Sequence, residues 1–215
     1  MHARFRSPVH RLVPFLCLAL FVANTGMAAD TPKAATGAPK VAADASKAQQ
    51  DAAMAEMMKL SAPGPMHALL KPLEGKWKAS IKSWMGPTPT ISEGTCERTW
   101  IMGGRYLQSK HSGDMMGMPF EGMEILTYDN MKKQFTSVWM DNMAPMLTLA
   151  TDGQADATGK IITMNSLMPD PATGNMVPFK DTYKIVDNDH YMFTISGMKD
   201  GKEYAMMEIS YTRVQ

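Results

Sequence analysis

The sequence predicts an all-β protein, an antiparallel meander of about ten strands. From Glu74 onward, short runs rich in Thr, Ile, Val, Tyr, Phe and Trp alternate with Gly, Pro, Asn and Asp. No helical pattern of about 10–15 residues separates these runs, which excludes a parallel sheet built from βαβ units. Strands that follow one another so closely pair through hairpins, as in a meander barrel or a sandwich.

The expected strands can be placed in order along the chain. They are residues 76–84, 91–101, 105–112, 119–128, 133–140, 145–151, 159–168, 178–187, 190–197 and 202–213. Turn-forming residues separate them, for example Gly103 with Gly104 and Asp129 with Asn130.

The two ends of this strand region favour a barrel over a sandwich. Gly75 and Trp77 open the first strand, and Arg213 lies at the end of the last strand. This arrangement resembles the calycin group, which includes lipocalins, fatty-acid-binding proteins and nitrobindin-like barrels. The resemblance implies that the first and last strands pair and that Arg213 stacks on Trp77 at that seam. Such a cation–π contact contributes about 0.5–2 kcal/mol.

A longer resemblance covers residues 67–213, about 147 of the 215 residues. This region is similar to the bacterial family known as domain of unknown function 1579. The residues that carry the likeness are HALLKPLEGKW (67–77), WIMGGRYL (100–107), SGDMMGMPFEG (112–122), TYDN (127–130), the strand with Trp139 and Asp141, and EISYTR (208–213). Thr127 stands where the family pattern has glycine. The resemblance implies a calycin-like barrel of residues 66–215, but no reaction, because the family has no settled activity.

Residues 1–28 have the three parts of a secretory signal peptide. Arginines precede an apolar run at 12–23, and Gly26 and Ala28 stand at the −3 and −1 places of a cleavage site. As a helix the run would span about 18 Å, short of the ~30 Å hydrocarbon core. We therefore expect cleavage after Ala28, a periplasmic or secreted protein, and no membrane span after the signal is removed. Cys96 is then the single cysteine, so no intramolecular disulfide is expected.

Two further segments precede the barrel. Residues 29–43 lack apolar periodicity and predict a disordered linker. Residues 44–65 predict an amphipathic helix followed by a Pro/Gly linker, with Met54, Met57 and Met58 forming a narrow apolar stripe. Residues 44–60 thus form either a surface helix or one that docks, on the barrel or on an envelope protein partner.

Composition and motif content narrow the class of function. The chain is 45% hydrophobic, enough for one well-packed domain with tails. Lys and Arg number 22 against 21 Asp and Glu, so no basic surplus favours nucleic acid. No nucleophile elbow, phosphate-binding glycine-rich loop or HExxH motif is present. No catalytic residue is assigned, and we expect binding rather than catalysis.

The expected strand faces carry aromatic side chains that would point into a barrel. Alternation places Phe120 and Tyr128 on one face of their strand, and Trp139 on the corresponding face of the next. A small barrel is either filled by such side chains or holds one small ligand, and the sequence leaves both possibilities open. For an apolar or amphipathic ligand, the candidate residues are Arg105, His111, Phe120, Tyr128 and Trp139. No cofactor is expected for this function.

Methionine supports an alternative function. The chain has 23 methionines, and thioethers are soft ligands that favour Cu(I). If residues 114–120 are extended, Met116 and Met118 share a face, and His111 lies in the preceding strand, so these three residues are the candidate copper ligands. Methionine also fills irregular cores well, and the methionines are spread along the chain.

Overall fold

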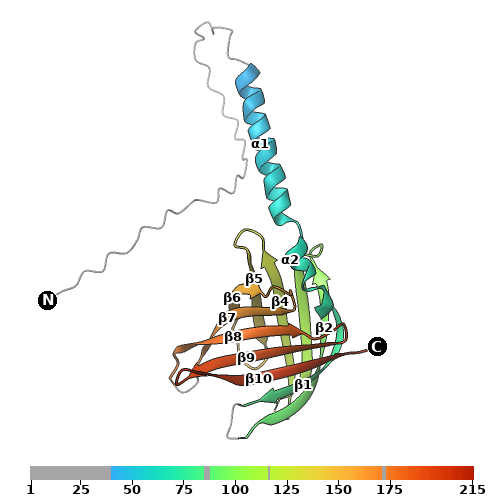
Figure 1. Cartoon of the computed structure of the whole chain (residues 1–215), viewed down its shortest axis with the longest axis vertical. Helices are drawn as coiled ribbons and strands as arrows, with labels where there is room; N and C mark the ends of the chain where they lie inside the picture. Colours follow the sequence, from blue (N-terminus) through green and yellow to red (C-terminus); the bar gives the residue numbers. More distant parts are fainter. Residues whose placement is uncertain (1–39, 85–87, 116, 171–172) are drawn as a thin grey trace, which may run out of the picture. The chain divides into compact units, whose positions relative to one another are not determined.

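Ten antiparallel strands form a closed barrel (Figure 1), as the sequence predicts. The computed structural model describes residues 40–84, 88–115, 117–170 and 173–215. The strands are β1 (Gly75–Ser83), β2 (Thr90–Ile101), β3 (Tyr106–Met115), β4 (Met118–Asp129), β5 (Gln134–Asp141), β6 (Thr148–Ala155), β7 (Ile161–Pro169), β8 (Met176–Ile185), β9 (His190–Lys199) and β10 (Lys202–Arg213). Each strand pairs with its neighbours in sequence, and β1 pairs with β10 to close the barrel.

Each expected strand is present, and β6 departs most from its expected bounds. It begins at Thr148 rather than residue 145, because the Asp141 carboxylate accepts hydrogen bonds from the backbone N–H groups of Met143 and Ala144 and holds a turn there. It extends past residue 151 because the register with β7 shifts between Thr151 and Gln154, which lets pairing resume after an irregularity.

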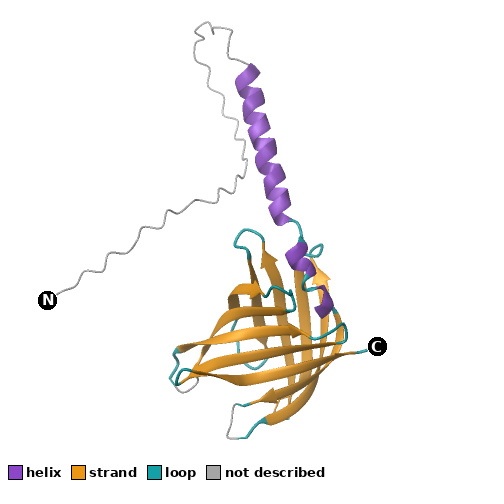
Figure 2. Cartoon of the chain, viewed as in Figure 1, coloured by secondary structure: helices purple, strands orange, loops and turns teal. Residues whose placement is uncertain are grey.

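In the described part of the chain, three helical segments precede the barrel (Figure 2): α1 (Lys40–Ser61), α2 (Pro65–Ala68) and the 3₁₀ turn η1 (Lys71–Leu73). Helix α1 begins at Lys40, so the end of the expected linker is helical. Residues 1–28 and 29–39 lie outside the described residues. The methionines of the predicted stripe, Met54, Met57 and Met58, are 58%, 64% and 66% exposed. No described helix is long and apolar enough to cross a membrane.

The barrel interior is filled at the end where β1 begins and β10 finishes. Leu70 and Leu73, from the segment before β1, are completely buried against Trp77, Leu126 and other inward side chains of the strands. The Trp77 indole Nε1 donates a hydrogen bond to the Leu73 carbonyl, 2.9 Å away. This half of the barrel is therefore a packed core rather than a cavity.

The seam between β1 and β10 is closed by Arg213. Its guanidinium lies 4.1 Å from the centre of the Trp77 ring. The same group donates hydrogen bonds to the carbonyls of Pro72, Glu74 and Asn188 at 2.7–2.9 Å. Gly75 has φ of +123°, and a Cβ there would overlap the Arg213 side chain, so only glycine fits this close approach.

Replacing Arg213 with alanine should lower the free energy of unfolding by about 2–4 kcal/mol, because the change removes the cation–π contact and the bonds of a charged donor. Lys78→Ala is the matched control, since Lys78 is exposed on β1 opposite Thr212, and it should change stability by less than about 0.5 kcal/mol. Urea unfolding followed by tryptophan fluorescence measures both. Equal losses in the two variants would contradict this role of Arg213.

Candidate ligand-binding cavity

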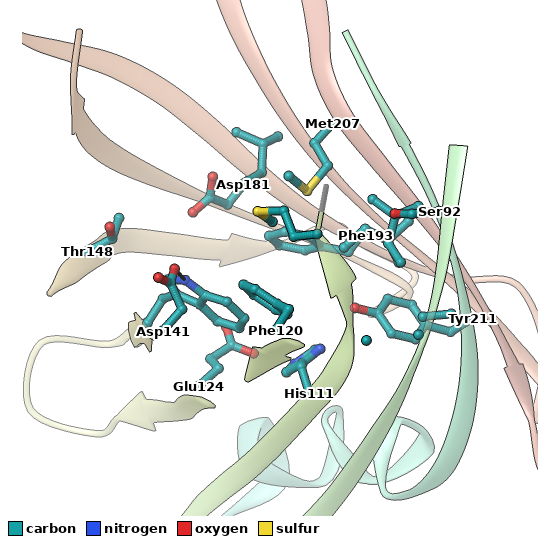
Figure 3. Close-up of a pocket in the computed structure, with 18 of the residues that line it drawn as sticks. Ser92, His111, Phe120, Glu124, Asp141, Thr148, Asp181, Phe193, Met207 and Tyr211 are labelled. Carbon is teal, nitrogen blue, oxygen red and sulfur yellow. Dashed lines mark hydrogen bonds between the residues drawn. The ribbon is translucent and has the colours of Figure 1, made fainter. Parts of the chain in front are cut away.

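A cavity of about 330 Å³ lies in the other half of the barrel, toward the turns that join β3 to β4 and β9 to β10. Its wall is largely apolar and aromatic, and Trp139 is among the residues that line it. Figure 3 shows Phe120, Phe193 and Tyr211 around it. The rings of Phe120 and Trp139 are stacked, with centroids 6.3 Å apart. The barrel is thus filled at one end and hollow at the other.

Strand alternation and register bring these side chains to one place. Phe120 and Glu124 are both inward positions of β4, and Trp139 is registered with Glu124 across the β4–β5 pair. Thr148 of β6 is in turn registered with Trp139. The wall of the cavity is therefore continuous across three neighbouring strands.

A buried ion pair lies between the packed core and the cavity. Arg98 of β2 is 1% exposed, and its Nη1 lies 3.3 Å from Glu124 Oε2. The Tyr183 hydroxyl donates to both oxygens of Glu124, at 2.6 and 2.7 Å. Arg98 Nε donates to the Tyr191 hydroxyl at 3.1 Å. Burial, together with the negative charge of Glu124, raises the pKa of Tyr183 well above its usual value, so that hydroxyl stays protonated and keeps donating.

His111 of β3 is neutral in this setting. Burial, together with the charge of Arg98, lowers the pKa of His111 from 6.5 to about 3. Its Nε2 lies 3.0 Å from Ser109 Oγ and 3.6 Å from Cys96 Sγ. The ring meets Trp139 edge to face, with centroids 5.1 Å apart. His111 therefore presents an uncharged ring to the cavity.

Asp181 of β8 is a second buried carboxyl group, on the wall formed by β6, β7 and β8. Its Oδ1 accepts a hydrogen bond from Ser166 Oγ at 3.0 Å. Burial, only partly offset by that bond, raises the pKa of Asp181 from 3.8 to about 6. The negative charge of Glu124 acts in the same direction as burial.

The cavity contains some of the residues expected from sequence and not others. His111, Phe120 and Trp139 line it. Arg105 does not, because β3 begins after it, at Tyr106, and its side chain bonds to the carbonyls of Ser61 and Met102 instead. Nor does Tyr128, which packs in the filled half against Phe135, with ring centroids 5.0 Å apart. Arg105 lies outside the strand, and Tyr128 lies at the filled end, because the face of a strand does not say which end of the barrel a residue reaches.

The candidate copper ligands are not brought together within the described residues. Met116 lies outside them. His111 is registered with Gly122, and Met118 lies four residues before Gly122 in β4, about 14 Å away at ~3.4 Å per residue. The His111 Nε2 is also directed toward Ser109, away from Met118. Among the described residues, no group of three or more His, Cys, Asp and Glu side chains has a geometry that could hold a metal ion.

The residues that sequence reasoning missed are the buried charges, Arg98, Glu124 and Asp181. Arg98 alternates with Cys96 on the inward face of β2, and Glu124 alternates with Leu126 on β4. A charged residue at an inward position of an otherwise apolar strand face is the signal that would have found them.

Two solved structures are similar to this chain. The crystal structure of Rv2717c from M. tuberculosis is 15% identical and has a TM-score of 0.50, covering 72% of this chain and 100% of that one. A redesigned β-barrel is also 15% identical, with a TM-score of 0.34, covering 70% of this chain and 96% of that one. At this identity the first likeness shows the fold alone. A search of curated proteins found no match.

The family comparison is more extensive. A family model described as "Protein of unknown function (DUF1579)" matches residues 62–213. That range contains α2, η1 and the ten strands of the barrel. This chain therefore belongs to the DUF1579 family.

Proposed function

We propose that this protein is an exported binding protein that holds one small apolar or amphipathic molecule inside its barrel. The observation that carries the proposal is the cavity of about 330 Å³ lined by Phe120, Trp139, Phe193 and Tyr211. Small-molecule sites are typically apolar cavities of roughly 300–1,000 Å³ with a few polar groups that orient the ligand. Export rests on the signal-peptide pattern of residues 1–28.

The interior supports binding rather than simple packing. A packed protein interior leaves few voids larger than a water molecule, because empty space forfeits dispersion contacts. The filled half, with Leu70, Leu73 and Leu126 at 0% exposure, meets that standard. The hollow half departs from it, so its apolar wall gains contacts when a ligand of matching shape enters.

Narrowing the cavity should weaken the binding of an apolar probe. Ala150 lines the cavity and is 2% exposed, whereas Leu149, the preceding residue of β6, is 58% exposed. We expect Ala150→Phe to weaken binding of N-phenyl-1-naphthylamine, which is uncharged at neutral pH, at least tenfold. We expect Leu149→Phe to leave the affinity within about twofold, because its ring points outward. Titration of probe fluorescence at constant protein concentration measures both.

A second interior variant, Thr148→Trp, tests the same site if Ala150→Phe fails to fold. Thr148 lines the cavity and is partly exposed, so Thr148→Trp should narrow the cavity with less strain and also weaken probe binding. Equal affinities in the wild type, Ala150→Phe and Thr148→Trp would show that the probe binds elsewhere and would refute the proposed site.

A further inference from the structure

The charged side chains on the cavity wall are mostly acidic. The acidic and basic residues that line the cavity are Arg98, His111, Glu124, Asp141 and Asp181, together with the exposed Glu93 and Asp114. Arginine is the single permanent cation in this set, and five of the seven residues are carboxylic acids.

The positive charge of Arg98 is buried and is already opposed by Glu124, although Nη1 makes no hydrogen bond among the described residues. Its Nη1 faces Glu124 Oε2 at 3.3 Å, and its Nε is bonded to the Tyr191 hydroxyl. The Arg98 side chain is 1% exposed. His111 carries no charge at neutral pH. The single permanent cation among the residues that line the cavity is thus buried and already paired with a carboxylate, which disfavours an anionic ligand.

Asp181 differs from the other buried acid. Glu124 has a cation and the Tyr183 hydroxyl, whose one proton lies between its two oxygens, whereas Asp181 has only the Ser166 hydroxyl, on Oδ1. Within the described part of the chain, no Lys, Arg or His forms an ion pair with Asp181, and Oδ2 has no hydrogen-bond donor. Buried carboxylates are normally paired with a cation or a metal, because an unpaired charge in a low-dielectric interior is costly. Asp181 is 8% exposed and has no cationic partner among the described residues. A ligand in the cavity can supply that partner.

The carboxylate of Asp141, at the end of β5, already has hydrogen-bond donors on both oxygens. Asp141 accepts the Trp139 indole N–H on Oδ2 and the backbone N–H of Met143 on Oδ1. Figure 3 shows Asp181 and Thr148 on one side of the cavity, with the rings of Phe120 and Phe193 beside it. A free acceptor and an apolar surface therefore meet in one cavity.

We propose that the ligand is an amphipathic amine, whose protonated nitrogen donates to Asp181 Oδ2 while its apolar part lies against Phe120, Trp139 and Phe193. This inference rests on the proposed function, since it assigns the chemical class of the ligand in the same cavity. The ammonium group supplies the counter-charge that Asp181 lacks, and a charge-assisted hydrogen bond orients the ligand. A carboxylate in the same position would meet Glu124 and Asp181 without an accessible cation.

Three naphthalene derivatives that differ only in their polar end test this assignment. They are 1-naphthylmethylamine, 1-naphthalenemethanol and 1-naphthoate, titrated into the full mature protein by calorimetry at pH 7.5. We expect the amine to bind at least tenfold more tightly than the alcohol, and the carboxylate to bind most weakly. Asp181→Asn should remove the preference for the amine and leave the affinity for the alcohol within about threefold.

Asp114→Asn is the matched control. It removes the same charge at the edge of the cavity, and the asparagine oxygen can still accept the Gly117 N–H bonded to Asp114 Oδ1. It should leave the preference for the amine largely intact. An alcohol that binds as well as the amine, or an equal loss in both variants, would overturn the role of Asp181 while leaving the cavity as a binding site. Failure of all three compounds to bind would overturn both the amine assignment and the proposed function.

Discussion

Replacing Arg98 with methionine should lower the free energy of unfolding by about 3–5 kcal/mol, because the change leaves the Glu124 carboxylate buried without its cation. Glu124 is 5% exposed and would retain only the Tyr183 hydroxyl as a donor. A domain of this size has a total stability of only about 5–15 kcal/mol, so the variant should unfold at markedly lower denaturant concentration. Guanidinium titration followed by tryptophan fluorescence measures the change.

The double variant Arg98→Met with Glu124→Gln should be more stable than Arg98→Met alone, because neither charge remains and the amide oxygen still accepts from Tyr183. Lys76→Met is the matched control. Lys76 of β1 forms a 3.9 Å ion pair with Glu97 of β2, but the two side chains are 71% and 52% exposed. Such surface pairs contribute about 0–1 kcal/mol. A loss below about 1 kcal/mol in Arg98→Met, or a double variant no more stable than the single, would contradict the importance of the buried pair.

Acidification from pH 7 toward pH 3 should destabilise the protein through His111 by up to about 5 kcal/mol. The pKa of His111 is about 3 in the folded protein and 6.5 in the unfolded chain. As the pH falls through this window, the unfolded chain takes up a proton that the folded protein does not. The contribution of neutral His111 to the free energy of unfolding is therefore fully present above pH 6.5, and it is progressively lost as the pH approaches 3.

Asp181 should act in the opposite direction, and by less. Its pKa is about 6 in the folded protein and 3.8 when unfolded, so the folded protein holds the extra proton between these values. Stability should fall by up to about 3 kcal/mol as the pH rises from 3.8 to 6. Near pH 5 the two residues partly cancel in the wild type.

Single substitutions separate the two contributions. His111→Gln should flatten the loss of stability below pH 6, and Asp181→Asn should steepen it, in urea unfolding at pH 7, 5.5 and 4. Asp181→Asn should also be more stable than the wild type at pH 7, because it removes an unpaired buried charge. A His111→Gln protein with the same pH dependence as the wild type would show that His111 is solvated rather than buried.

The strands were predictable because their signals are local. Alternation of polar and apolar residues has a period of two, and turns need Gly, Asn or Asp at particular positions. The turn before β3 shows that these local signals do not fix the exact residue at which a strand begins. Met102, Gly103 and Gly104 all have positive φ, which ends β2 and delays β3 until Tyr106, so Arg105 belongs to the turn and not to the strand face.

The cavity and its charges were less predictable because they depend on the register of several strands. Arg98 reaches Glu124 because both residues are registered with Ser109 of β3, which lies between them. The sequence alone does not show that Arg98 and Glu124 meet, because a whole strand and two turns separate them along the chain. Whether inward rings such as Phe120 fill a barrel or line a space depends on the summed volume of all facing side chains, which alternation does not give.

Native mass spectrometry tests most directly whether the barrel holds a small molecule. The protein is purified without denaturation from the cells that produce it. We predict a bound organic mass, one per chain, that is lost in Ala150→Phe and retained in Leu149→Phe. An amine among the released compounds would support the assignment to Asp181. A spectrum of the bare chain alone, in the wild type and in both variants, would contradict the account and leave the cavity without a ligand.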